Sequence, residues 1–362
     1  MRQPVSIHVP EYRPPPGVLG GHLQTAVPAL FREVEGVDYR RQRLELPDGD
    51  FLDLDVLPAS GERTPRPPDS RGAPPARGPD RGRRAALISH GLEGSSGRAY
   101  VRGMAKAFAG RGWDAVAWNH RGCSGEPNRL LRAYHSGATE DLAAVVEWAL
   151  AEGYGSLGLV GFSLGGNVTL KYVGDEAGGI APEIVGAVGI SVPVDLAGSA
   201  AVMSRWDRRL YMRRFIGTLA LKAEEKARRF PDAPAASGVR EMKSFAEFDG
   251  RFTAPLHGFA SAEDYWARCS ALPVLPRVAV PTLLASARND PFLAPTCFPD
   301  VANPLFTLAA PPAGGHVGWP RWPLAEELWS ETVAARWLEA CYAPSPEAPS
   351  LEASRSAPPS TA

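Results

Sequence analysis

The stretch that decides the fold is Leu157-Gly158-Leu159-Val160-Gly161-Phe162-Ser163-Leu164-Gly165-Gly166. An apolar run typical of a strand ends in Gly-x-Ser-x-Gly, and helical periodicity follows through Val168, Leu170 and Tyr172. Glycine–serine patterns also occur by chance in loops, but a strand before and a helix after favour a sharp turn that lifts the hydroxyl out of the sheet. Ser163 is therefore the predicted nucleophile of an acyl transfer through a covalent intermediate.

Strand and helix patterns alternate on both sides of this turn. Apolar strand patterns cover residues 85–89, 113–118, 157–162, 184–192, 281–286 and 305–308. Helical periodicities cover residues 100–108, 138–150 and 324–341 and the segment after Ser163. A turn at 47–50 separates two loosely alternating segments, 39–46 and 51–57, which indicates a hairpin. The alternation predicts an α/β fold with a mostly parallel central sheet and helices on both faces.

The alternation of strand and helix breaks between residues 195 and 275, where helical patterns occur without a clear strand. An insertion after one strand of a parallel sheet is expected to lie over the carboxyl edge of the sheet, where such folds bind ligands. We therefore predict a helical cap over 195–275 and an α/β core built from 1–194 and 276–342. A Pro/Arg-rich segment, 60–84, is predicted to be a flexible loop, and 343–362 a disordered tail.

Composition argues against several classes of function. The formal net charge is -1, so the chain has no global attraction to nucleic acid or to anionic membranes. The four cysteines form no CxxC pair and no metal-ligand spacing, which is typical of a reducing compartment. The first residues are polar and proline-rich, and no apolar run is long enough to span a membrane. The chain is predicted to be cytoplasmic, with no nucleic-acid partner and no transmembrane segment, while its oligomeric state stays open.

A histidine base and an acid are the other side chains that a serine-dependent site needs. A serine hydroxyl needs a base, usually histidine, and the histidine needs an acid that holds its tautomer. His316 stands in a glycine-rich loop after the last predicted strand, and Asp290 follows the strand before it. Asp264 lies in the predicted cap and Asp300 has no strand before it, so both are weaker candidates for the acid. The chain order Ser163, Asp290, His316 predicts a catalytic triad.

Two backbone N–H groups are expected to hold the oxyanion that forms on the carbonyl. One belongs to Leu164, directly after the serine and at the start of the next helix. The other is assigned to Leu92, in the loop that follows the strand over 85–89. His90 of the same loop is expected to brace it rather than to act as the base, because it comes well before the serine in the chain.

Together these segments resemble the α/β-hydrolase superfamily, and within it the YheT-like branch, a group of predicted esterases that includes the ABHD1/ABHD3-type lipid hydrolases. The matching segments are 20–25, 90–96, 119–125, 134–137, 161–167, 248–265, 289–292 and 314–318. The likeness runs from about residue 14 to residue 342 and implies the same triad, an esterase activity and no cofactor or metal. Trp266 stands where the family pattern has a tyrosine, and Ala285 where a larger aliphatic residue is expected. These departures concern cap packing and pocket shape only.

The substrate pocket is predicted from fewer signals. Its expected lining residues are Glu93, Tyr134, His135, Met203, Trp206 and Trp319. Tyr134 and His135 fit equally well as the start of the following helix. An apolar stripe that begins at Met203 and includes Trp206 and Leu210 is surrounded by arginines. The stripe either lies on a lipid surface or packs over the pocket, and the second interpretation is favoured because such stripes usually face a core.

These observations predict a serine carboxylesterase that hydrolyses acyl esters, including short- or medium-chain lipid esters, through an acyl-enzyme. An acyltransferase, thioesterase, carbon–carbon hydrolase, phospholipase or lysophospholipase would use the same triad. A non-catalytic binding protein is disfavoured by the intact serine, acid and histidine. The expected partner is a small-molecule ester, and peripheral contact with a membrane stays open. Cys123 is interpreted as part of a glycine-bounded loop, because no neighbouring cation is evident that would make it a reactive thiolate.

Overall fold

The computed structural model describes residues 2–60, 82–176 and 179–342, and within them the centre of the fold is an eight-stranded sheet. Its strands are β1 (Arg40–Glu45), β2 (Phe51–Leu57), β3 (Arg83–Ser89), β4 (Asp114–Trp118), β5 (Tyr154–Phe162), β6 (Ile184–Ile190), β7 (Thr282–Ala285) and β8 (Phe306–Ala309). They stand in the order β1-β2-β4-β3-β5-β6-β7-β8. The pairs β1–β2 and β2–β4 are antiparallel, and every other neighbouring pair is parallel.

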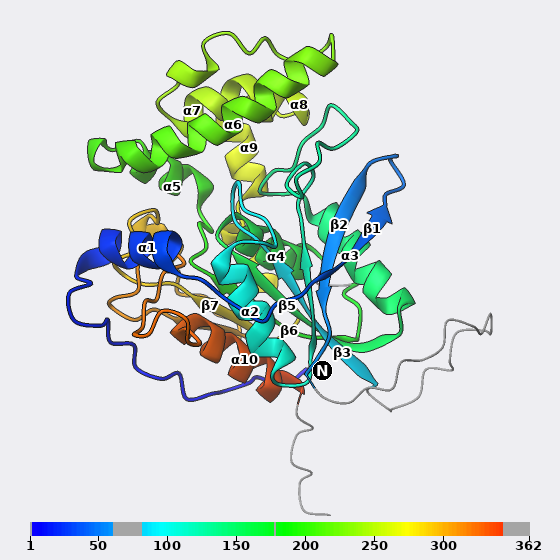
Figure 1. Cartoon of the computed structure of the whole chain (residues 1–362), viewed down its shortest axis with the longest axis vertical. Coiled ribbons are helices and arrows are strands. Elements are labelled where there is room, and N and C mark those ends of the chain that lie inside the picture. The colour runs from blue at the N-terminus through cyan, green and yellow to red at the C-terminus, as the bar shows by residue number, and fades with distance from the viewer. Residues whose placement is uncertain (1, 61–81, 177–178, 343–362) are drawn as a thin grey trace, which may run out of the picture.

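Helices cover both faces of this sheet (Figure 1). The longer helices of the core are α1 (Gly20–Phe31), α2 (Ala99–Ala109), α3 (Thr139–Ala151), α4 (Leu164–Asp175) and α10 (Trp329–Tyr342). Apolar residues of α3 and α4 pack into one buried cluster with the sheet, and those of α2 and α10 pack into another. The predicted α/β fold, with a mostly parallel sheet between two helical layers, is confirmed.

The chain between β6 and β7 is fully described and contains helices and loops but no strand. Its α-helices are α5 (Leu196–Met203), α6 (Arg209–Arg229), α7 (Phe245–Phe248), α8 (Ala254–Leu256) and α9 (Ala262–Cys269). Figure 1 shows these helices, green to yellow, as a separate layer beyond one edge of the sheet. The layer has its own buried apolar cluster, to which Met212, Ile216 and Phe252 contribute. None of the helices in the described ranges is long and apolar enough to cross a membrane.

Several predicted boundaries differ from the structure, and β5, for example, begins at Tyr154 rather than at residue 157. The loop over 60–84 ends earlier than expected, because β3 begins at Arg83, whose guanidinium donates to Asp114 Oδ2 at 3.0 Å. Most of that loop and the predicted tail, 343–362, lie outside the described residues. The last helix starts at Trp329 rather than at residue 324, and the N–H of Leu328 at its start donates to Glu331 Oε2 at 2.8 Å.

The helix α1 was not predicted from the sequence. It carries an internal proline, Pro28, and few helix-forming residues, so its pattern does not distinguish it from a loop. The buried side of α1 consists of Gln24, Thr25 and Pro28. At its end, Arg32 forms a buried ion pair with Glu331 of α10, with 2.6 Å between Nη1 and Oε1. Tertiary contacts rather than local propensity therefore hold this helix in place.

Candidate active site

Ser163 occupies a sharp turn between β5 and α4. Its φ is +51°, a left-handed conformation that is strained for a residue with a side chain. A Cβ on Gly161 would collide with the carbonyl oxygen of Gly165, and a Cβ on Gly165 would collide with the carbonyl oxygen of His90. Only glycine fits at both positions, so the Gly-x-Ser-x-Gly spacing has a steric cause here.

The structure brings the three residues of the predicted triad together. His316 Nε2 lies 3.0 Å from Ser163 Oγ, and His316 Nδ1 lies 2.8 Å from Asp290 Oδ2. The side chains of Asp290 and His316 are 0% and 10% exposed. The second carboxylate oxygen of Asp290 accepts from the N–H of Phe292 at 2.9 Å. With the proton on Nδ1 held by the carboxylate, Nε2 is free to accept the serine proton.

The two weaker candidates for the acid lie elsewhere. Asp264 is on α9, where its carboxylate accepts from the N–H of Ala260 at 3.0 Å and faces Arg268 at 3.4 Å. Asp300 is exposed in the loop before β8. The carboxylate that His316 Nδ1 contacts is that of Asp290, so Asp290 is the acid that the geometry supports.

The amides of Leu92 and Leu164 are the predicted oxyanion donors. Within the described residues, neither amide has a hydrogen-bond partner in the protein. By contrast, the amides of Gly91 and Glu93 on either side of Leu92 donate to tyrosine hydroxyls at 3.0 and 2.9 Å. A Cβ on Gly91 would lie 3.2 Å from the Cβ of Ser163, so this loop passes directly beside the serine. Two free amides therefore lie beside the hydroxyl, as an oxyanion hole requires.

His90 braces this loop, in agreement with the role expected for it. Its Nδ1 donates to the carbonyl oxygen of Gly91 at 2.8 Å, and its Nε2 accepts from the N–H of His120 at 3.1 Å. Burial lowers the pKa of His90 well below its usual value, so the imidazole is neutral and both of its nitrogens are used for structure.

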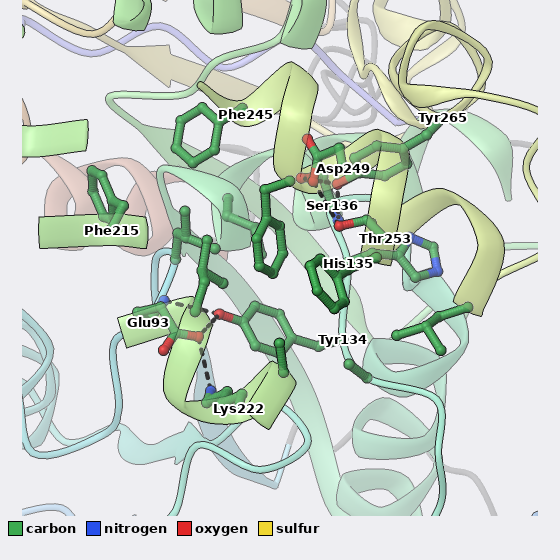
Figure 2. A pocket seen from close by; sticks show the side chains of 18 of the residues that line it. Glu93, Tyr134, His135, Ser136, Phe215, Lys222, Phe245, Asp249, Thr253 and Tyr265 are labelled. Carbon is green, nitrogen blue, oxygen red and sulfur yellow. Dashed lines mark hydrogen bonds and ion pairs between the residues drawn. The ribbon is translucent and has the colours of Figure 1, made fainter. Parts of the chain in front are cut away.

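A cation from α6 reaches the same loop (Figure 2). Lys222 Nζ lies 2.8 Å from Glu93 Oε1 and 3.0 Å from Cys123 Sγ. The hydroxyl of Tyr134 donates to Glu93 Oε1 at 2.6 Å. The expectation that Cys123 has no cationic neighbour is thus wrong, because Lys222 approaches from far along the chain. Burial nevertheless raises the pKa of the Cys123 thiol, although Lys222 acts to lower it, so the thiol stays protonated.

A cavity opens between the core and the helices over 196–269, and Ser163 and His316 line it. Of the predicted pocket residues, Glu93, Tyr134, His135 and Met203 line it as well. Figure 2 shows two polar groups around this space, with the rings of Phe215 and Phe245 to one side of them. One group is the Glu93–Tyr134–Lys222 cluster. The other contains Asp249, which accepts from Thr253 Oγ1 at 2.6 Å, and Tyr265, which donates to Ser136 Oγ at 2.8 Å.

Two predicted pocket residues do not line the cavity. Trp206 is exposed, because it precedes α6 on the outer side of the helical layer. Trp319 is fully buried in the core, where its ring stacks on Trp329 with 4.4 Å between centroids and packs edge-on against Tyr12. The apolar stripe is therefore divided: Met203 faces inward, whereas Trp206 and Leu210 face solvent.

Sequence reasoning assigned no role to α1, yet this helix supports both loops of the predicted triad. Gln24 Oε1 accepts from the N–H of Gly314 at 2.8 Å and from Asn289 Nδ2 at 2.9 Å. The hydroxyl of Thr25 accepts from the N–H of His316 at 2.8 Å. The available signal was the segment 20–25, which belongs to the family pattern but has no recognisable chemistry by itself.

The chain was compared with known proteins. A family model described as "alpha/beta hydrolase fold" matches residues 87–299. The YheT protein of Escherichia coli (strain K12), whose name carries a provisional esterase assignment, is 35% identical over 336 residues, which cover 91% of this chain and 93% of that protein. This chain is an α/β hydrolase of the YheT-like branch.

Two further comparisons place this α/β hydrolase among more distant proteins. The human phospholipase ABHD3 is 27% identical over 317 residues, which cover 83% of this chain and 73% of that protein. An esterase of Pyrococcus furiosus, PF2001, has a similar structure with a TM-score of 0.53 and 15% identity, over 92% of this chain and 98% of that one. The second likeness concerns the fold alone. The predicted membership of the YheT-like branch is confirmed.

Proposed function

We propose that this α/β hydrolase is a serine carboxylesterase in which Ser163, His316 and Asp290 form the catalytic triad. The observation that supports the proposal best is the continuous chain of hydrogen bonds from Ser163 Oγ through His316 to Asp290 at 3.0 and 2.8 Å. The two unpartnered amides of Leu92 and Leu164 support it further, since such donors stabilise charge only in the transition state.

The reaction follows from this geometry. Ser163 Oγ attacks the ester carbonyl while His316 Nε2 takes the hydroxyl proton, and the amides of Leu92 and Leu164 hold the oxyanion. Collapse of this intermediate breaks the ester C–O bond, and His316 returns the proton to the leaving alcohol. Water then attacks the acyl-enzyme with His316 as base, which releases the acid and restores the serine. Asp290 holds the imidazolium through its hydrogen bond to Nδ1 and stabilises its charge.

The cavity supports a substrate with an apolar acyl part. Most of the side chains that line it are apolar or aromatic, including Leu92, Met203, Phe215 and Phe292. We propose that the helices over 195–275 act as a cap that closes over the acyl chain. Short- or medium-chain lipid esters fit this lining, and a phospholipase among the relatives is consistent with them.

Other acyl chemistry uses the same parts. A thioesterase, an acyltransferase, a phospholipase and a lysophospholipase differ in the leaving group or in the acceptor, and the intact triad favours each of them over a binding protein. We also propose that the enzyme works in the cytoplasm, because its four cysteines are free thiols. Product analysis with ester, thioester and phospholipid substrates, with and without an added alcohol acceptor, separates these activities.

The test is a panel of p-nitrophenyl esters of graded chain length, run on the native protein and on Ser163→Ala. Turnover is expected to fall by a factor on the order of 10³ or more, with an unchanged unfolding transition. A fluorophosphonate probe is expected to label the native protein and not the variant. Ser204→Ala, on the exposed side of the helical layer, is the matched control and keeps both signals. Near-native hydrolysis by Ser163→Ala would refute the proposal.

A further inference from the structure

We propose that the outer face of α1 and the start of α6 together form a docking surface for an anionic lipid bilayer. The surface consists of Leu19, Leu23, Leu30 and Phe31 on or beside α1, and of Trp206 and Leu210 at or just before the start of α6. The inference deepens the proposed function, because it names the surface from which lipid esters would be taken. The exposed fractions of these six side chains lie between 48% and 84%.

The outer face of α1 is an apolar stripe without a partner in the described part of the chain. Leu19, Leu23 and Leu30 fall on one side of the helix, since residues four and eleven apart point in nearly the same direction. Gln24 and Thr25, which hold the loops of the triad, lie on the opposite side and are buried. The helix therefore has one face that supports the site and another that is apolar and open to solvent.

The start of α6 has the same arrangement. Met212 and Ile216 are buried against the rest of the helical layer, whereas Leu210 and the preceding Trp206 are exposed. Isolated exposed apolar residues are ordinary, but a contiguous set that includes a tryptophan is typical of an interaction surface. Tryptophan in particular favours the boundary between water and hydrocarbon.

The two apolar faces are joined by a ring contact. The rings of His22 on α1 and Tyr211 on α6 stack with 5.7 Å between centroids and an interplanar angle of 12°. Figure 1 accordingly shows α1 on the same side of the molecule as the end of α6 near α5. Segments far apart in the sequence thus contribute to one surface, and most of the large exposed apolar side chains in the described residues gather on it.

The charge at the α6 part of the surface favours an anionic partner. Arg205, Arg209, Arg213 and Arg214 are exposed at the start of α6, and Asp207 is the acidic residue of the same segment. The whole chain has a net charge of -1, so this cluster is a local excess of positive charge. Basic side chains near an anionic membrane are attracted to its surface charge. In a symmetric contact with a second copy, by contrast, these arginines would face one another at a cost.

The surface lies close to the proposed base. Tyr211 packs on Phe292 with 4.8 Å between centroids, and Phe292 packs on the ring of His316 at 4.3 Å. Two side chains, Tyr211 and Phe292, therefore link the docking surface to His316. A membrane on this surface would present lipid esters beside the cavity, where the cap helices contact the core.

The proposal is tested by co-sedimentation of the full chain with vesicles of phosphatidylcholine, with and without phosphatidylglycerol. The native protein is expected to bind the anionic vesicles, and Trp206→Ser with Leu210→Ser to lower binding by about tenfold or more. Arg209→Glu with Arg213→Glu is expected to abolish the preference for anionic vesicles. Arg277→Glu, an exposed arginine in the segment before β7, is the matched control and binds as the native protein does. Thermal denaturation verifies that each variant is folded.

Three outcomes would overturn the inference. The first is the absence of native binding to anionic vesicles, and the second is binding that the Trp206/Leu210 variant retains in full. The third is a concentration-dependent dimer in light scattering that the same variant dissociates, because the surface would then bind a second copy. Ser163→Ala is expected to bind vesicles as the native protein does, so failure of the esterase proposal would appear in the ester assay and leave the sedimentation unchanged.

Discussion

Replacement of Gln24 by methionine tests whether α1 positions the two loops of the proposed triad. Gln24 is 1% exposed, and its single Oε1 accepts from the N–H of Gly314 and from Asn289 Nδ2. The first donor lies in the loop of His316, and the second is adjacent to Asp290. One oxygen thus holds together the loops that carry the base and the acid. Methionine has a similar volume but cannot replace this acceptor.

The expected magnitudes follow from these two hydrogen bonds. Leaving a buried donor without a partner costs about 1–3 kcal/mol. Two donors lose their acceptor here, and the amide of Asn289 counts for less because it is only partly buried. The free energy of unfolding is therefore expected to fall by about 2–4 kcal/mol. A displacement of about 1 Å between reacting groups costs about 100-fold in rate. We therefore expect kcat to fall by about 10- to 100-fold. KM is expected to change little, because Gln24 does not line the cavity.

The assay is steady-state hydrolysis of a p-nitrophenyl ester together with urea unfolding of the same samples. Gln24→Glu is the control for positioning, because a carboxylate oxygen still accepts from both donors, although burial of its charge and loss of the donor to the carbonyl oxygen of Val18 lower the free energy of unfolding as well. It is expected to recover most of kcat. If Gln24→Met is destabilised but keeps the native kcat, then α1 stabilises the fold without positioning the triad, and the reasoning fails.

Three further variants test other parts of the structure. Arg32→Met leaves the buried carboxylate of Glu331 unpaired, since both side chains are 2% exposed, and should lower the free energy of unfolding in urea by about 3–5 kcal/mol. A loss below about 1 kcal/mol would contradict this. Burial raises the pKa of Asp249 from 3.8 to about 6, so its ionisation costs stability above pH 6. As the pH falls from 6 toward 3.8 the carboxylate is protonated, and the melting temperature should gain from the relief of this cost. Asp249→Asn should lack this gain, and a variant with the same pH dependence of the melting temperature as the native protein would exclude the effect. Lys222→Met should lower kcat by about tenfold, because Glu93 of the oxyanion loop loses its cation, and Lys222→Arg should restore most of the rate.

The site residues that were predictable are those whose chemistry forces a local pattern. Ser163 could be found because its turn excludes side chains at Gly161 and Gly165, so the spacing is visible in the sequence. His316 and Asp290 could be found because each follows a strand, and parallel strands deliver the loops after them to the same edge of the sheet. The core strands were visible for the same reason, since burial on both faces makes them continuously apolar.

The parts that were missed depend on contacts between distant segments. Lys222 lies 99 residues from Cys123 and looks like any solvated lysine on a helix, so its position beside the oxyanion loop leaves no local signal. Trp206 and Met203 belong to one apolar stripe, yet only the second faces the cavity, because the chain turns between α5 and α6. Trp319 follows the loop of His316, but the backbone turns its ring into the core.

Backbone strain shows why the surroundings of the site had to be seen in the structure. The non-glycine residues with positive φ in the described ranges are Glu93, Ser163, Ser191, Val317 and Trp319. All of them lie in loops that follow strands and surround the proposed nucleophile and base. Each such conformation costs about 1–3 kcal/mol unless neighbouring contacts fix it. The fixing contacts are the long-range ones: Tyr134 holds the amide of Glu93, and the hydroxyl of Ser191 accepts from the N–H of Val317 at 2.9 Å. Backbone strain is therefore concentrated in the loops around the proposed nucleophile and base, where the positions of the reacting groups matter most. The side chains that hold these strained conformations come from elements that are distant in the sequence, so no local pattern predicts them.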